Sequence, residues 1–247
     1  MFLVSVLYWA WFVLTLPILF VPALVIFVIT APFDRRRITL HLYTCFWAQF
    51  LLASNPMWRV RVVGSRKIPW RKPVVIASNH ASLIDILVLL RLYRPYRWVS
   101  KIENFKLPII GWLMHLDGYV PLVRGNRESV VKMMEQCRAL LRAGNSLMMF
   151  PEGTRSKTGE LQPFKAGAFQ LAAETGVPVI PVAVHGTHES LPKHGLILRD
   201  RMDAVVEVLD PIDPADFATV EDLSDATRAV IEDALKGHPP PALERAV

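Results

Sequence analysis

The chain opens with an apolar stretch, Met1 to Phe33, that contains no charged side chain. This stretch exceeds the roughly 20 apolar residues that cross a bilayer as a helix, and no positive segment precedes it as in a secretory signal. Pro17 and Pro22 predict a kink or an end of that helix. A second apolar stretch, Ile38 to Ala53, is short for a span. Two arrangements stay open: a kinked span followed by an interfacial helix, or a helical hairpin that enters one leaflet, which the prolines favour.

From Trp58 onward the hydrophobic pattern changes to short strand-like runs that alternate with helical runs. Such alternation predicts an α/β domain with a mainly parallel sheet flanked by helices. We expect three parts: membrane-embedded helices over 1–55, the α/β domain over 56–237, and a loose tail over 238–247. Strands are predicted within 58–64, 72–79, 96–101, 118–123, 146–150, 177–186 and 204–212, and helices within 83–93, 108–116, 126–144, 164–176 and 220–237. The helix over 108–116 is expected to hold Pro108 in its first turn, and Asn126 and Gly144 are expected to cap the longer helix at 126–144.

The net charge indicates which class of ligand the protein binds, and the positions of the two cysteines indicate a reduced state. The formal net charge is +6, which fits nucleic acid, anionic lipid or a phosphorylated substrate. The sequence has no nucleic-acid motif and no zinc-ligand spacing, so anionic lipid is the expected partner, with no nucleic acid and no metal. Arg35, Arg36 and Arg37 follow the first apolar stretch, which places the remaining chain on the cytoplasmic side of the cell membrane. Cys45 and Cys137 are expected to be reduced packing residues.

Polar residues gather where the predicted strands end. These ends read SNH, SKIEN, VRGN, FPEGTR and VHGT. Because ligands bind at the carboxyl ends of strands in open parallel sheets, we expect the functional site there. His185, in the last of these segments, is expected to be structural, since a single histidine at a strand end more often satisfies a local hydrogen bond.

The segment SNHASLID places His80 and Asp85 five positions apart. On one helix the two side chains would diverge, so they can meet only if His80 lies in a loop and Asp85 in the first helical turn. In one interpretation, Ser82 caps the helix and Asp85 completes a capping box. In the other, Asp85 orients His80 as a base that takes a proton from a hydroxyl. Because no serine or cysteine stands in a nucleophile elbow, that hydroxyl would belong to the substrate.

Cationic side chains stand at the ends of three predicted strands. In FPEGTRS, Arg155 could clamp a phosphate, Gly153 could let the backbone approach a ligand, and Glu152 could hold Arg155 or the loop. An ordinary exposed turn is the alternative for this segment. Arg124 and Lys101 end two other strands and could meet the same phosphate.

In this order, the motifs resemble those of the PlsC-type glycerolipid acyltransferases, over roughly Trp58 to Asp210. The family's motifs match Asn79, His80 and Asp85; Gly118 and Arg124; Phe150 to Ser156; and the proline-containing Val177 to Pro181. A lysine–proline–glycine pattern between the first two motifs matches Lys101, Pro108 and Gly111.

The resemblance implies transfer of a fatty acyl group from an acyl thioester to the sn-2 hydroxyl of 1-acyl-glycerol-3-phosphate (lysophosphatidic acid), giving phosphatidic acid. The thioester co-substrate would be acyl-CoA or an acyl carrier protein, with no other cofactor. His80 and Asp85 would be catalytic, and substrate would be bound by Lys101, Arg124, Glu152, Gly153, Thr154 and Arg155. Backbone N–H groups near Gly153, or at the helix start after His80, are candidate oxyanion donors. Alternatives are another lyso-lipid acceptor (lysophosphatidylglycerol or a lyso-ornithine lipid), a thioesterase, and a non-catalytic lipid-binding membrane protein.

Overall fold

A computed structural model describes residues 2–156, 158–188, 190–191, 197–198 and 201–237. The loose tail predicted over 238–247 lies outside the described residues. The division of the chain at residue 55 remains a prediction.

A seven-stranded sheet forms the centre of the molecule, in the order β1-β7-β6-β2-β5-β3-β4. Every neighbouring pair is parallel except β6 and β7, which are antiparallel. The prediction of a mainly parallel sheet is therefore confirmed. The carboxyl ends of β2 to β6 share one edge of the sheet, and these are the ends at which the polar segments were predicted. The strands are β1 (Trp58–Val63), β2 (Val75–Ser78), β3 (Arg97–Lys101), β4 (Val120–Leu122), β5 (Leu147–Met149), β6 (Val179–His185) and β7 (Met202–Val208).

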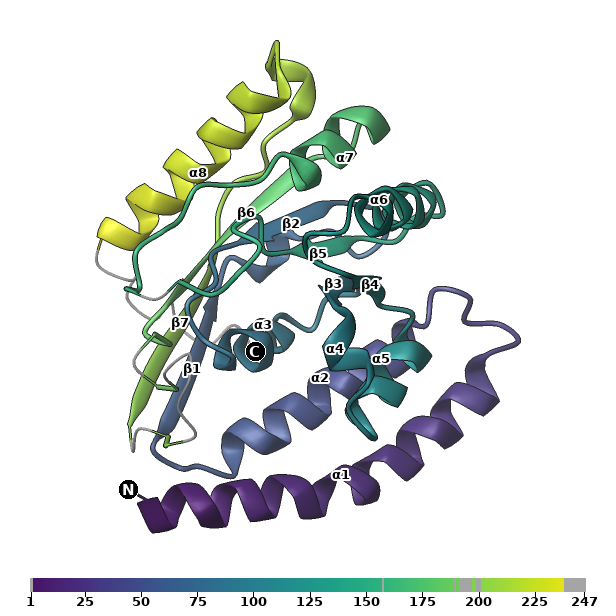
Figure 1. Ribbon diagram of the computed structural model, residues 1–247, viewed down its shortest axis with the longest axis vertical. Coiled ribbons are helices and arrows are strands. Elements are labelled where there is room, and N and C mark those ends of the chain that lie inside the picture. Colours follow the sequence, from purple (N-terminus) through teal and green to yellow (C-terminus); the bar gives the residue numbers. More distant parts are fainter. Residues whose placement is uncertain (1, 157, 189, 192–196, 199–200, 238–247) are drawn as a thin grey trace.

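Helices cover both faces of this sheet (Figure 1). The helices α6, α7 and α8 pack on one face, while α3 and the pair α1–α2 lie on the other. Alternate residues of the buried strands serve the two cores: Ile76 and Met148 face the α2–α3 side, and Val75 and Leu147 face the α6–α7 side. The helices are α1 (Phe2–Thr30), α2 (Ile38–Ala53), α3 (Ile84–Leu89), α4 (Ile102–Phe105), α5 (Ile110–Asp117), α6 (Arg127–Arg142), α7 (Gly167–Thr175) and α8 (Val220–Lys236).

The two prolines of α1 do not end it. The helix runs without interruption from Phe2 to Thr30, and it curves along its length (Figure 1). Each proline removes one backbone hydrogen bond, but packing against α2 and α5 holds the helix together on both sides of Pro17 and Pro22. A broken first helix is therefore excluded, and the curvature is the form that the predicted kink takes.

The segment before α5 also differs from the prediction. The helix begins at Ile110, and Pro108 lies ahead of it instead of in its first turn. Ile109, between them, has a φ of 65°, which is rare for a β-branched residue. The predicted ends of α6 are confirmed: the Asn126 side chain accepts from the Ser129 N–H at 2.8 Å, and Gly144 has a left-handed φ of 82° just after the helix.

The first two helices form an antiparallel pair that packs on the domain. The Tyr8 hydroxyl of α1 donates to the Leu51 carbonyl of α2 at 3.1 Å, and the Tyr43 hydroxyl of α2 donates to the Leu19 carbonyl of α1 at 2.9 Å. A buried bond from the Thr44 hydroxyl to Asp117 Oδ2, 2.8 Å long, joins α2 to the end of α5. By length and composition, Leu3–Thr30 could cross a membrane, and only 11% of its most apolar window is buried.

The cysteines are unpaired. Cys45 of α2 and Cys137 of α6 point into the cores on opposite faces of the sheet, and both are fully buried. Their predicted role as packing residues is confirmed.

Candidate active site

His80 and Asp85 meet at the carboxyl end of β2. Nδ1 of His80 lies 2.9 Å from Oδ2 of Asp85, whose side chain is fully buried. The contact is possible because His80 lies in the loop after β2 and Asp85 lies in the first turn of α3, as the spacing predicted. An ionised carboxylate can only accept, so Nδ1 carries the proton and Nε2 is left as the basic nitrogen.

Asp85 also closes the loop that carries His80. The same Oδ2 accepts the backbone N–H of Ala81 at 2.7 Å and that of Ser82 at 2.8 Å. The capping and the catalytic interpretations are therefore both correct, because Oδ2 of Asp85 accepts from the imidazole of His80 and from the two backbone N–H groups at the helix start. Ser82 takes part in the cap in a modified form: its Oγ accepts the backbone N–H of Ile84 at 3.4 Å, while its hydroxyl donates to the Leu191 carbonyl at 3.2 Å.

The His80 ring is held on its face as well as at its edge. Phe150, the residue after β5, stacks on the imidazole with a centroid separation of 3.8 Å and an angle of 9° between the planes. Trp98 packs against Phe150 in turn, at 5.2 Å. This stack fixes the rotation of the ring, so that Nε2 is presented to the cavity that His80 lines.

The FPEGTRS segment holds the backbone of His80 on both sides. Oε1 of Glu152 accepts the His80 N–H at 2.7 Å, and the Ser156 N–H donates to the His80 carbonyl at 2.8 Å. Oε2 of Glu152 accepts the Gln162 N–H at 3.1 Å, which ties the following loop to the same carboxylate. On the other side, the Asn79 amide exchanges two bonds with Val184 of β6, at 2.8 and 3.0 Å.

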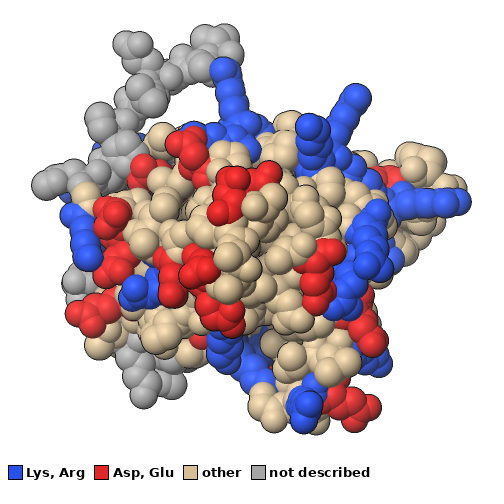
Figure 2. Space-filling model, turned by 90° about the horizontal axis from the view of Figure 1, so that it is seen from above, with Lys and Arg blue, Asp and Glu red and all other residues tan. Residues whose placement is uncertain are grey.

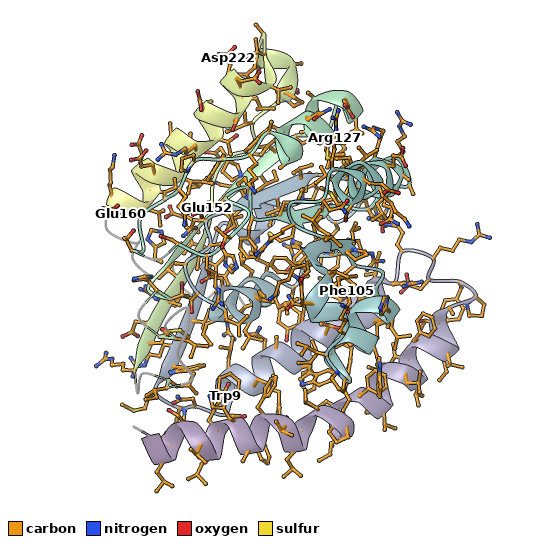
Figure 3. The ribbon with its side chains drawn as sticks, in the orientation of Figure 1. Trp9, Phe105, Arg127, Glu152, Glu160 and Asp222 are labelled. Atoms are coloured by element: carbon orange, nitrogen blue, oxygen red, sulfur yellow. The ribbon has the colours of Figure 1, made fainter. Side chains whose placement is uncertain are left out.

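Glu152 and Gly153 do not line the cavity in front of His80. Glu152 lies inside the molecule (Figure 3), with 4% of its surface exposed, and burial raises the pKa of its carboxyl to about 7 against the two N–H bonds that lower it. Gly153 has a left-handed φ of 72° and forms the turn against Lys165. Their contacts are those of a support for the loop, and a direct role with substrate remains a prediction for both residues.

The remaining predicted site residues come together around one cavity of about 530 Å³. Lys101 at the end of β3, Arg124 after β4, and Thr154 and Arg155 after β5 line it together with His80. The parallel order β2-β5-β3-β4 produces this gathering, since it brings the carboxyl ends of the four strands to one edge.

The rest of this cavity is apolar and extends to the N-terminal helices. Trp9 of α1 points toward the domain (Figure 3) and lines the cavity with Tyr8 and Phe12. Sequence reasoning did not assign these residues to the site, because apolar cavity walls and apolar cores have the same residue pattern. The other apolar lining residues are Leu83, Ile84, Ile86, Leu87, Leu90, Trp98, Val99, Leu107, Ile110, Leu113, Met114, Tyr119, Phe150, Leu191 and Leu198.

Three of the candidate oxyanion donors already have acceptors. Ala81 and Ser82, at the helix start, donate to Asp85, and the Gly153 N–H donates to the Phe150 carbonyl at 3.0 Å. His185 lies 3.2 Å from Glu207 Oε2 on the neighbouring strand, which agrees with a structural role. Among the described residues, no group of three or more His, Cys, Asp or Glu could hold a metal ion.

Comparisons with known proteins place the chain in a family. A sequence model of the family described as Acyltransferase matches residues 59–185. The chain is 41% identical over 191 residues to a 1-acyl-sn-glycerol-3-phosphate acyltransferase of Chlamydomonas reinhardtii, covering 76% of this chain and 57% of that protein. It is 35% identical to the enzyme of the same name from Saccharomyces cerevisiae, covering 72% and 60%.

The crystal structure of the 1-acyl-sn-glycerophosphate acyltransferase PlsC from Thermotoga maritima has the same fold, with a TM-score of 0.78 and 26% identity over 95% of this chain and 94% of that one. Against the curated relatives the coverage is lower, and the chain spans a little over half of the length of the first of them. The matched segment contains the histidine–aspartate pair, the arginines and the FPEGTRS loop, and it shows that this chain belongs to the Acyltransferase family.

Proposed function

We propose that this protein transfers a fatty acyl group from an acyl thioester to the sn-2 hydroxyl of 1-acyl-glycerol-3-phosphate and so forms phosphatidic acid. One observation carries the proposal. The basic nitrogen of His80 faces a single cavity that combines cationic residues with a long apolar wall. A phosphorylated lyso-lipid and a fatty acyl chain together need both surfaces.

The proposed chemistry uses one proton and no acyl-enzyme. Nε2 of His80 takes the proton of the acceptor hydroxyl as its oxygen attacks the thioester carbonyl carbon. Asp85 holds the opposite nitrogen and stabilises the imidazolium that forms. The tetrahedral intermediate collapses with cleavage of the carbon–sulfur bond, and His80 returns the proton to the leaving thiolate. The products are an ester and a free thiol of coenzyme A or an acyl carrier protein.

The cationic side of the cavity fits a phosphomonoester. Lys101, Arg124 and Arg155 line the same cavity from three strand ends. A phosphomonoester carries close to two negative charges at neutral pH, and guanidinium groups match its oxygens in pairs. A lyso-lipid whose phosphate is a diester carries one charge and would use these cations less fully.

The apolar side of the cavity fits an acyl chain. Its volume of about 530 Å³ lies in the range of small-molecule binding sites. The wall includes residues of α1, such as Trp9 and Phe12, so the helix that carries the apolar surface also completes the site.

We further infer that α1 lies along the surface of one leaflet on the cytoplasmic side. It packs against α2 and α5 along its length, from Tyr8 near the start to Phe27 near the end. If α1 stood upright across the bilayer, the domain beside it would have to enter the hydrocarbon with its charged side chains, which is costly. The face opposite α1 carries many side chains of both charges (Figure 2), as expected for a surface turned to water.

The test measures release of free thiol by the full chain in detergent. A long-chain acyl-CoA, and then an acyl carrier protein thioester, is supplied with lysophosphatidic acid, with lysophosphatidylglycerol, or with no acceptor. We expect thiol release only with the phosphomonoester acceptor, and its loss in His80→Ala with an unchanged folded structure by circular dichroism.

The other outcomes are decisive too. Release that requires lysophosphatidylglycerol would reassign the acceptor. Release of equal rate without any acceptor would replace acyl transfer by thioester hydrolysis. Full activity in His80→Ala would refute the assigned base.

A further inference from the structure

The helix α5 is apolar around most of its circumference, yet it is not fully enclosed. Leu113 and Leu116 pack into the cluster formed by α1 and α2, while Ile110 and Met114 face the catalytic cavity. The third side of the helix faces outward and carries Trp112. A helix with apolar residues on all sides is stable only when protein or lipid covers each of them.

The outward side contains large exposed apolar side chains. Trp112 is 54% exposed, and Leu107, in the turn before the helix, is 46% exposed. Trp112 lies within the helix, and Leu107 stands between Lys106 and the apolar pair Pro108 and Ile109. Tryptophan with one side covered and the other open is characteristic of positions at a membrane–water interface.

This surface continues the exposed apolar face of α1. The ring of Trp112 lies 5.7 Å from that of Phe20, centroid to centroid, and the neighbouring Val21 is 61% exposed. Basic side chains stand at the two ends of the α5 surface: Lys106 precedes Leu107, and Arg37 donates to the His115 carbonyl at 2.9 Å. Cations around an apolar surface match the anionic head groups that surround the hydrocarbon of a bilayer.

From this continuity we propose that the outer face of α5, defined by Leu107 and Trp112, is a second membrane-binding surface that enters the bilayer interface beside α1. The occupant is the phospholipid bilayer. Leu107 lines the cavity and is also exposed on the outer face. At this point a single side chain therefore separates the catalytic cavity from the proposed lipid. The proposal rests on the proposed membrane location of α1, but not on the reaction or its acceptor.

Site-specific fluorescence tests this contact directly. Both native cysteines are fully buried, so a cysteine introduced at the surface can be labelled selectively with an environment-sensitive fluorophore. The full chain is labelled at Trp112→Cys, at Val21→Cys on α1, and at Val131→Cys, whose residue is 51% exposed on α6 across the sheet. Each protein is mixed with vesicles of phosphatidylethanolamine and phosphatidylglycerol that contain a lipid with a nitroxide near its carbonyl.

We expect vesicles to quench the label at positions 112 and 21 and to leave the label at position 131 unchanged. Quenching at 21 without quenching at 112 would overturn the proposal and leave the membrane location of α1 intact. Quenching at none of the three positions would overturn both. A labelled protein that binds vesicles but shows no acyl transfer would refute the proposed function alone.

Kinetics provide an independent readout. Trp112 does not line the cavity, so Trp112→Glu should retain its thiol-release rate when donor and lysophosphatidic acid are supplied in detergent. On vesicles that contain the same lyso-lipid, we expect its rate to fall roughly tenfold, and Val131→Glu to keep both rates. A rate on vesicles that falls no further than the rate in detergent would overturn the assignment.

Discussion

The structure predicts that Glu152 acts on turnover and not on acceptor binding. Its carboxylate accepts the N–H of His80 at 2.7 Å and the N–H of Gln162 at 3.1 Å, and it does not reach the cavity. The informative change is Glu152→Gln, which keeps the shape of the side chain. A glutamine has one acceptor oxygen, so its amide NH₂ must face one of the two backbone N–H groups.

The magnitude follows from this conflict. A buried N–H without an acceptor costs about 1–3 kcal/mol. If the misplaced His80 adds this whole cost to the activation free energy, kcat falls about 5- to 150-fold, since each 1.4 kcal/mol corresponds to about tenfold in rate. The KM for lysophosphatidic acid should change little, because none of the lost contacts is made to substrate.

The assay is steady-state thiol release with varied acceptor, with Glu160→Gln as the matched control. Glu160 lies in the same loop, and its side chain is exposed at the outside of the molecule (Figure 3). Glu160→Gln should retain the kcat of the wild type and its KM for lysophosphatidic acid. A large rise in KM with unchanged kcat in Glu152→Gln would refute the positioning role and favour the substrate contact that the family resemblance implies.

Three further predictions concern the pair, the phosphate site and a buried acid. Asp85→Asn should lower kcat by about 10³- to 10⁴-fold in the same assay, because an amide NH₂ would face the backbone donors and disturb the tautomer of His80; activity within a factor of two of the wild type would contradict this. Arg155→Ala should raise the KM for the phosphomonoester acceptor by at least tenfold, as expected for loss of a charged hydrogen bond of about 1.5–3 kcal/mol, and unchanged kcat and KM would exclude the phosphate role. Burial raises the pKa of Asp117 to about 6. The folded state therefore keeps a proton that the unfolded chain loses between about pH 4 and 6, and stability should fall by up to about 3 kcal/mol as pH rises through that window. Chemical denaturation should show a flatter pH dependence in Asp117→Asn, and an identical slope would refute this account.

The sequence predicts each strand of the sheet but not their order. Short apolar runs with turn signals identify β2, β5 and β6, because a strand buried on both faces has an uninterrupted hydrophobic pattern. The position of β1 beside β7 joins segments from opposite ends of the domain, and no local pattern encodes that pairing. The continuity of α1 through its prolines was missed for the same reason, since packing against α2 and α5 overrides the local preference.

The site was predicted where its chemistry depends on local spacing or on strand ends. The contact of His80 with Asp85 follows from a loop–helix boundary, and the gathering of Lys101, Arg124 and Arg155 follows from parallel strands. The stack of Phe150 on His80 could not be predicted, because an apolar residue after a strand gives no sign of its partner. The motif allowed Glu152 to hold the loop, and its bonds to the backbone N–H groups of His80 and Gln162 confirm that role. The substrate contact that the family resemblance implies for Glu152 remains a prediction.

Asp85 and Glu152 both position His80, but they hold different parts of it. Asp85 uses one oxygen for the imidazole and for two backbone N–H groups, so the same atom sets the tautomer of the base and the conformation of its loop. No substitution at Asp85 can separate these two effects. Glu152 contacts His80 through the backbone N–H and not through the imidazole, so we expect its substitution to keep the imidazole–carboxylate bond. Comparing the two variants thus measures how much of the rate depends on the placement of the loop and how much on the state of the ring.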